Sequence, residues 1–166
     1  MNVDALRNAH DTLLAAATTV SGADGTLSPP DGEWDADRIL AHVSRIDGVT
    51  LGAVSAVASG VNTTYDNRIA LDTWTIDRLV TVAGGRDGLC ARIRRQGEAL
   101  VGLGGTMSAP ELATPIPTRL LSHGDVLVDT VLSLADLLGG LADGELPAHT
   151  RQLLSLLPPA HPDRPG

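Results

Sequence analysis

Four long stretches in which apolar residues recur every three or four positions constrain the fold more than any other feature of this chain. That spacing matches the 3.6-residue period of an α-helix with one buried face. It predicts helices over residues 2–20, 35–59, about 71–105 and 133–157. Runs rich in glycine and proline separate most of these stretches and predict loops, and the polar residues of 61–70 predict a further loop. Gly84, Gly85 and Gly88 weaken the middle of the third stretch, so we expect a kink there.

A short β-hairpin is predicted before the last helix. The runs Thr118–Ser122 and Val126–Thr130 flank the turn residues 123–125, which contain a glycine. We therefore expect an all-α fold, an antiparallel four-helix bundle with a small β-hairpin before the last helix. The bundle should form a single domain over residues 1–157. Two prolines end the last helix, and residues 158–166 should form a flexible tail.

The composition excludes several classes of function. The 166 residues include 20 acidic side chains and 12 arginines, but no lysine, and the formal net charge is −8. Such a chain lacks the basic surface that nucleic acids and anionic membranes require. No apolar run is long enough to span a membrane and no secretory signal is recognisable, so we expect a cytoplasmic protein. The single cysteine, Cys90, excludes an intramolecular disulfide and a cysteine-based zinc cluster.

Three polar residues occupy positions where the helical pattern calls for apolar ones. His42 lies three residues after Ile39 and four before Ile46, so it points into the predicted bundle. The apolar stripe of the last helix continues at Glu145 and His149, which share one face because they are four residues apart. A carboxylate that faces a core is costly unless it is paired or binds a metal. Two imidazoles and one carboxylate are a common ligand set for catalytic zinc, and iron or nickel can use the same set.

A second interpretation needs no metal. The same three side chains can form a hydrogen-bonded network in a non-catalytic bundle that binds a small molecule or a protein partner. Asp47 has two interpretations as well, because it can orient one of the metal ligands or form a surface salt bridge. Self-association of the bundle into a homodimer is compatible with either function.

Two motifs resemble those of the DinB-like superfamily. The first is Glu33-Trp34 followed by the Ile-Leu-Ala-His stretch that ends at His42. The second is Glu145-xxx-His149-xx-Gln152-Leu, in which glutamate replaces the histidine that is more usual at its first position. That replacement resembles the branch of mycothiol-dependent maleylpyruvate isomerases, although this chain lacks the additional C-terminal domain of that branch. The resemblance covers nearly the whole chain.

The resemblance implies a divalent metal, zinc or else nickel or iron, between the second and last helices. His42, Glu145 and His149 would be its ligands, while Trp34 and Gln152 would lie around the site. It further implies a small-molecule substrate and either hydrolysis or a thiol-dependent transfer or isomerisation. The arginine-only composition is typical of a GC-rich genome. In an actinobacterium, the thiol would be mycothiol.

Overall fold

The computed structural model describes residues 3–23, 25–122 and 124–158. Most of the predicted tail, residues 159–166, and the predicted turn residue His123 lie outside these ranges. The first two predicted helices are present as α1 (Val3–Ser21) and α2 (Ala36–Ala58). The carboxylate of Asp35 accepts a hydrogen bond from the backbone N–H of Arg38, and this N-cap fixes the start of α2.

The predicted third helix is divided into separate elements. A short α3 (Arg68–Leu71) precedes α4 (Thr73–Ala83), and α5 (Arg86–Thr106) follows after a break. The break coincides with two glycines that have positive φ angles, Gly84 at 80° and Gly85 at 79°. Residues with a side chain rarely adopt that conformation, so the glycine pair ends α4 where a kink was predicted.

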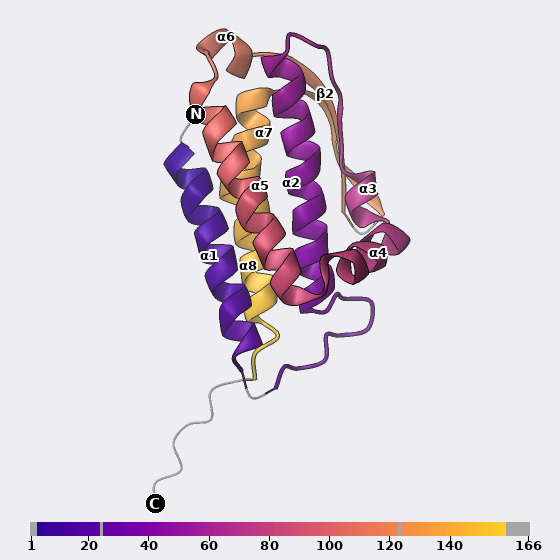
Figure 1. The fold of residues 1–166 in the computed structure, drawn as a ribbon. Coiled ribbons are helices and arrows are strands. Elements are labelled where there is room, and N and C mark those ends of the chain that lie inside the picture. Colours follow the sequence, from indigo (N-terminus) through magenta and orange to yellow (C-terminus); the bar gives the residue numbers. More distant parts are fainter. Residues whose placement is uncertain (1–2, 24, 123, 159–166) are drawn as a thin grey trace, which may run out of the picture.

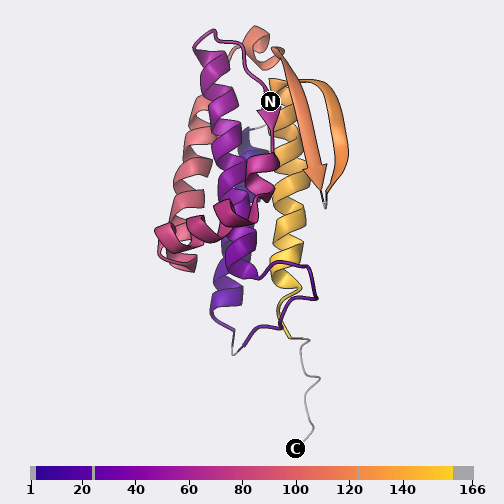
Figure 2. The same ribbon diagram turned by 90° about the vertical axis from the view of Figure 1, so that its right-hand side faces the viewer.

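A small mixed sheet covers one side of the helices. Strand β1 (Tyr65–Asp66) pairs in parallel with β2 (Pro115–Ser122), and β2 pairs antiparallel with β3 (Asp125–Ser133). The hairpin is therefore longer than predicted, and β1 lies in a segment that was predicted to be a loop. A short α6 (Ala109–Leu112) precedes β2. Figure 2 shows the sheet beside the last helical stretch.

The last helical stretch is continuous but not uniformly α-helical. It consists of α7 (Leu134–Gly140), a π-helical turn η1 (Leu141–Glu145) and α8 (Leu146–Leu154). Pro147 lacks the N–H that an α-helix would need at this point, and the π-turn immediately before it widens the backbone. Leu146 N–H accordingly donates to the carbonyl of Leu141, five residues earlier.

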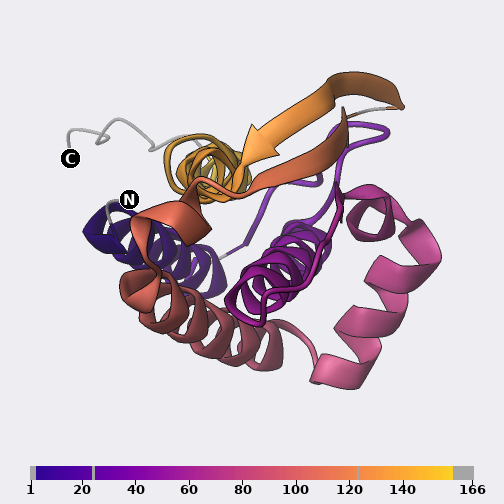
Figure 3. The same cartoon turned by 90° about the horizontal axis from the view of Figure 1, so that it is seen from above.

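The long helices α1, α2 and α5 and the α7–η1–α8 stretch lie side by side (Figure 1), and their facing sides hold the apolar core. Seen from above, α4 lies beside α2 at the edge of this group, and the hairpin lies beside the last helical stretch (Figure 3). The predicted all-α four-helix bundle with a hairpin is wrong. Helical periodicity detected the long helices, but it could not detect the two-residue strand that extends the hairpin into a sheet or the extra short helices.

Within the described residues, no helix combines the length and apolarity needed to cross a membrane.

Candidate metal centre

His42 lies in the second turn of α2, where its side chain is buried. Its Nδ1–H donates a hydrogen bond of 2.8 Å to the backbone carbonyl of Ala70, at the end of α3. A carbonyl oxygen can only accept, so this bond fixes the proton on Nδ1. The other ring nitrogen, Nε2, then points toward the last helical stretch.

Glu145 ends the π-turn, and His149 lies one turn later in α8. The π-turn changes the helix face that packs into the core, because Leu146, Thr150 and Leu153 are the buried residues of α8. Glu145 and His149 therefore lie beside the core rather than at its centre, with 37% and 16% of their side chains exposed. The sequence pattern placed them on the core stripe, whereas the structure places them where solvent has access.

The orientation of His149 is held by a chain of side chains. Gln152 donates from Nε2 to the carboxylate of Glu33 over 3.2 Å, which turns its amide oxygen toward His149. The Nδ1–H of His149 donates to that oxygen over 2.9 Å. As in His42, the proton is thereby placed on Nδ1 and Nε2 is left for another partner.

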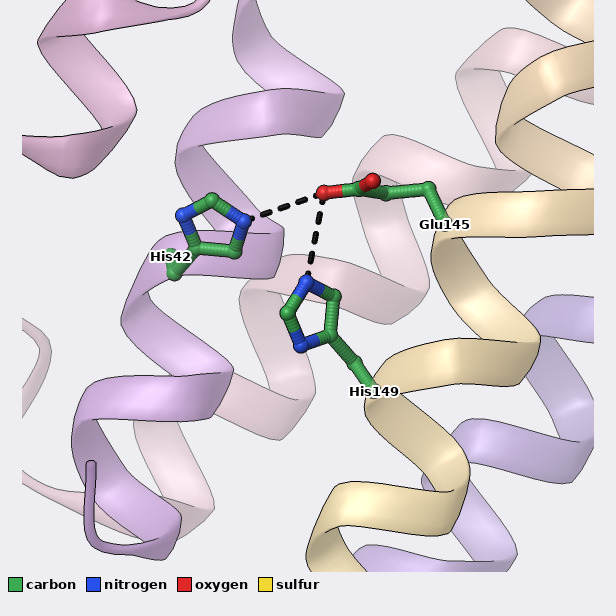
Figure 4. Close-up of side chains that lie close together, drawn as sticks. All are labelled: His42, Glu145 and His149. Atoms are coloured by element: carbon green, nitrogen blue, oxygen red, sulfur yellow. Dashed lines mark hydrogen bonds and ion pairs between the residues drawn. The ribbon is translucent and has the colours of Figure 1, made fainter. Parts of the chain in front are cut away.

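The two Nε2 atoms converge on one oxygen of Glu145 (Figure 4). Oε1 lies 3.0 Å from Nε2 of His42 and 3.2 Å from Nε2 of His149. The ligand atoms of all three side chains lie within 4.8 Å of one another. A tetrahedral zinc site with bonds of about 2.0–2.2 Å places its ligand atoms roughly 3.4 Å apart. The group can therefore hold a metal ion with small side-chain adjustments.

The protonation pattern also suits a cation. A neutral imidazole whose proton is on Nδ1 presents a lone pair at Nε2, and a lone pair facing a carboxylate oxygen is repulsive. Double protonation of both rings would remove that repulsion, but it would place two positive charges on rings whose centroids are 4.7 Å apart. One divalent ion satisfies all three donors at once. These residues thus fit the metal that the sequence motifs imply.

The histidines also affect the acidity of Glu145. Burial alone would raise the pKa of Glu145, but without a metal a proton on Nε2 of His149 or His42 makes a hydrogen bond to the carboxylate, and these bonds outweigh burial and hold the pKa below its usual range. The carboxylate is therefore ionised at neutral pH, as a metal ligand must be.

A cavity of about 720 Å³ opens beside these ligands. Its walls come from α2, α3, the three strands and the whole last helical stretch, together with the loop before α2. Leucines dominate the lining, and the two strands of the hairpin contribute several of them. This volume is in the range of small-molecule sites, which are mostly apolar with a few polar groups.

Of the residues predicted around the metal, Trp34 and Gln152 lie at the site and Asp47 does not. Trp34 lines the cavity, with its ring centroid 5.0 Å from that of His42. Gln152 orients His149. Asp47 is fully buried and accepts a hydrogen bond of 3.1 Å at Oδ1 from His10 of α1. The surface salt bridge considered for Asp47 is wrong for the same reason.

Sequence reasoning missed two parts of the site. Glu33 was noted within a motif but received no role, and its spacing from Gln152 gives no local signal for their contact. The carbonyl of Ala70 is a backbone group, which no residue pattern can reveal.

Comparisons with family models, curated proteins and solved structures find no match for this chain.

Proposed function

We propose that this protein is a metal-dependent enzyme whose divalent cation is held by His42, Glu145 and His149. One observation carries the proposal. Both imidazoles donate their Nδ1–H elsewhere, to Ala70 and Gln152, and both direct Nε2 at the same carboxylate oxygen. Histidines that bind a metal typically donate their other ring N–H to a carbonyl or a side chain in this way.

Zinc is the metal we propose, with nickel and iron as alternatives. Three protein ligands of the histidine and carboxylate type are typical of catalytic zinc, and they leave a position for a reactant. The cavity beside the ligands provides room for that reactant. A bound zinc ion would lower the pKa of a coordinated water or thiol, so that a nucleophile is available at neutral pH.

The described lining offers no independent general base close to the ligands. The Tyr65 hydroxyl lies within hydrogen-bonding distance, 3.0 Å, of the Thr50 hydroxyl, and burial raises the pKa of Tyr65 to about 12. Glu33 and Asp136 line the cavity but are exposed and hydrogen-bonded to Gln152 and Ser133. This supports chemistry in which the metal activates the nucleophile. We therefore propose either hydrolysis or a thiol-dependent transfer or isomerisation of the DinB-like type, with mycothiol as the thiol.

Elemental analysis of the native, tag-free protein tests the metal site. We expect about one equivalent of a transition metal, and its loss in His42→Ala, His149→Ala and Glu145→Gln. Glu111→Gln is the matched control, because Glu111 is a carboxylate in a helix cap away from the cavity. Circular dichroism should show that the variants remain folded, since the apolar core is unchanged.

The absence of metal from native protein, even after supplementation with zinc, nickel and iron, would contradict the proposal. It would favour a non-catalytic bundle that binds a small molecule or a partner. If the metal is present, turnover of esters or amides in water, compared with turnover that requires an added thiol, separates the two reaction classes.

A further inference from the structure

The charges around the cavity have one sign. Glu33, Asp136 and Glu145 are its charged lining residues, and no arginine belongs to the described lining. The chain has no lysine that could supply a positive charge instead. A ligand that enters this cavity therefore meets carboxylates at the rim, and only the metal centre offers positive charge.

The polar side chains of the lining are already engaged with the protein. Asn67 donates to the carbonyl of Leu121 over 2.9 Å and accepts from its N–H over 2.8 Å. The Tyr65 hydroxyl contacts Thr50, and Gln152 bridges Glu33 and His149. A carboxylate or phosphate on a ligand would thus lose its water and find few donors in exchange, which is unfavourable.

Apolar side chains make up most of the remaining surface. Leu120 and Leu132 come from the two strands of the hairpin, Leu137 and Leu141 from the last helical stretch, and Trp34 from the loop before α2. Leu141 is almost fully buried and Leu137 is nearly so, which makes this wall part of the protein core. Contact with such a wall favours a ligand through the removal of its own apolar surface from water.

We propose that the cavity accepts an uncharged, mainly apolar small molecule and disfavours one that carries a carboxylate away from the reacting group. The proposal rests on the proposed metal centre, which would bind the reacting end of the substrate. The leucine walls would hold the rest, and the rim carboxylates would repel an anionic substituent.

Three hydroxamic acids test this inference, because they share one metal-binding head. Benzohydroxamic acid is the parent, 4-carbamoylbenzohydroxamic acid adds a neutral group, and 4-carboxybenzohydroxamic acid adds an anion of nearly the same size. Their binding to the cobalt-loaded protein can be followed by the visible absorption of the metal. We expect the carboxy compound to bind about tenfold more weakly than the carbamoyl compound at low ionic strength.

A variant of Asp136 tests whether the rim charge causes the difference in affinity between the carboxy and carbamoyl compounds. Asp136→Asn removes one rim charge while its amide oxygen can still accept from Ser133, the cap of α7. It should reduce the tenfold ratio by about two- to threefold. Glu111→Gln makes the matching change in the capping box of α6, outside the cavity, and should leave the ratio unchanged.

The outcomes separate the two proposals. If cobalt produces no absorption bands that depend on His42 and His149, the metal centre itself is wrong. If the bands appear but the carboxy compound binds as tightly as the carbamoyl compound, the metal centre stands and the inference about the ligand is overturned.

Discussion

Two histidine–carboxylate groups connect the helices of this protein, and they differ in their access to solvent and in their protonation. His10 and Asp47 join α1 to α2 and are almost completely buried. His42, Glu145 and His149 join α2 to the last helical stretch beside a cavity. Both groups look alike in composition, so residue type alone does not distinguish them.

Their hydrogen bonds show the difference. His10 donates from Nδ1 to the carbonyl of Leu6 over 2.9 Å, and one further proton joins its Nε2 to Oδ1 of Asp47. Oδ2 of Asp47 is buried without a hydrogen-bond partner among the described residues, so this pair is enclosed by the core rather than open to a ligand. At the cavity, two imidazoles that have each already used one N–H face a single carboxylate, and this group can bind a cation that enters from the cavity. The comparison indicates that the convergence of three ligand atoms, together with access, marks the candidate functional site.

The largest effect should come from breaking the sealed pair. His10→Ala leaves the Asp47 carboxylate buried without its partner, and removal of one member of a buried pair costs about 3–5 kcal/mol. Urea denaturation should show that loss in the free energy of unfolding. His149→Ala in metal-free protein should cost only about 1 kcal/mol, because its position is partly exposed. Equal losses in the two variants would contradict the distinction.

Packing around His10 offers a second test. A Cβ atom on Gly97 of α5 would lie 2.8 Å from the His10 ring, whereas one on Gly102 of the same helix would meet nothing within 4 Å. Gly97→Ala should therefore reduce the free energy of unfolding by about 1–3 kcal/mol. Gly102→Ala should be neutral or stabilise the helix by up to about 1 kcal/mol. Thermal unfolding of the two variants measures the difference directly.

The chain Glu33–Gln152–His149 sharpens the comparison at the cavity. Gln152→Leu removes the acceptor that fixes the proton on Nδ1 of His149. Loss of such a partner typically weakens metal binding by about 10- to 100-fold. Competition with a chelator should measure the change in zinc affinity. Glu33→Gln keeps an acceptor for Gln152 and should have a smaller effect. Unchanged zinc affinity in Gln152→Leu would show that the chain does not support the metal centre.

The smallest effect concerns pH. Burial alone would lower the pKa of His10, but the hydrogen bond to Asp47 and the charge of Asp47 outweigh it and raise the pKa. The proton is therefore held more tightly in the folded than in the unfolded protein. Its contribution to stability is complete below the ordinary histidine pKa of 6.5 and is lost as pH rises through the raised value.

Denaturation of metal-free protein between about pH 6 and pH 9 measures this loss, a range that brackets the ordinary histidine pKa. The double variant His10→Met/Asp47→Leu removes both titrating groups and should show a shallower decline than the unmodified protein. An identical pH dependence in both proteins would argue against a proton held by the pair.

Sequence periodicity predicted the long helices because each has an apolar face of helical spacing. The break near Gly84 was also visible, since it depends on local backbone chemistry. Strand β1 could not be predicted, because two residues carry no periodicity and its pairing with β2 depends on residues more than 50 positions away. The predicted group of His42, Glu145 and His149 is brought together in space. His10 and Asp47 were not predicted as partners, because no motif links residues 37 positions apart.

The π-turn before Pro147 has a consequence for how sequence changes would alter this protein. Each residue of an α-helix advances the face by about 100°. If Leu141–Glu145 took up ordinary α-helical hydrogen bonds with all five residues kept, α8 would turn by about that angle relative to α7, whereas deletion of one residue would remove the wide turn and leave α8 in place. In the first case Glu145 and His149 would leave the cavity, and Leu146 and Leu153 would leave the core. The extra residue thus lets one helical stretch pack apolar side chains into the core along its whole length and still turn Glu145 and His149 toward the cavity. A helix of uniform register could not do both.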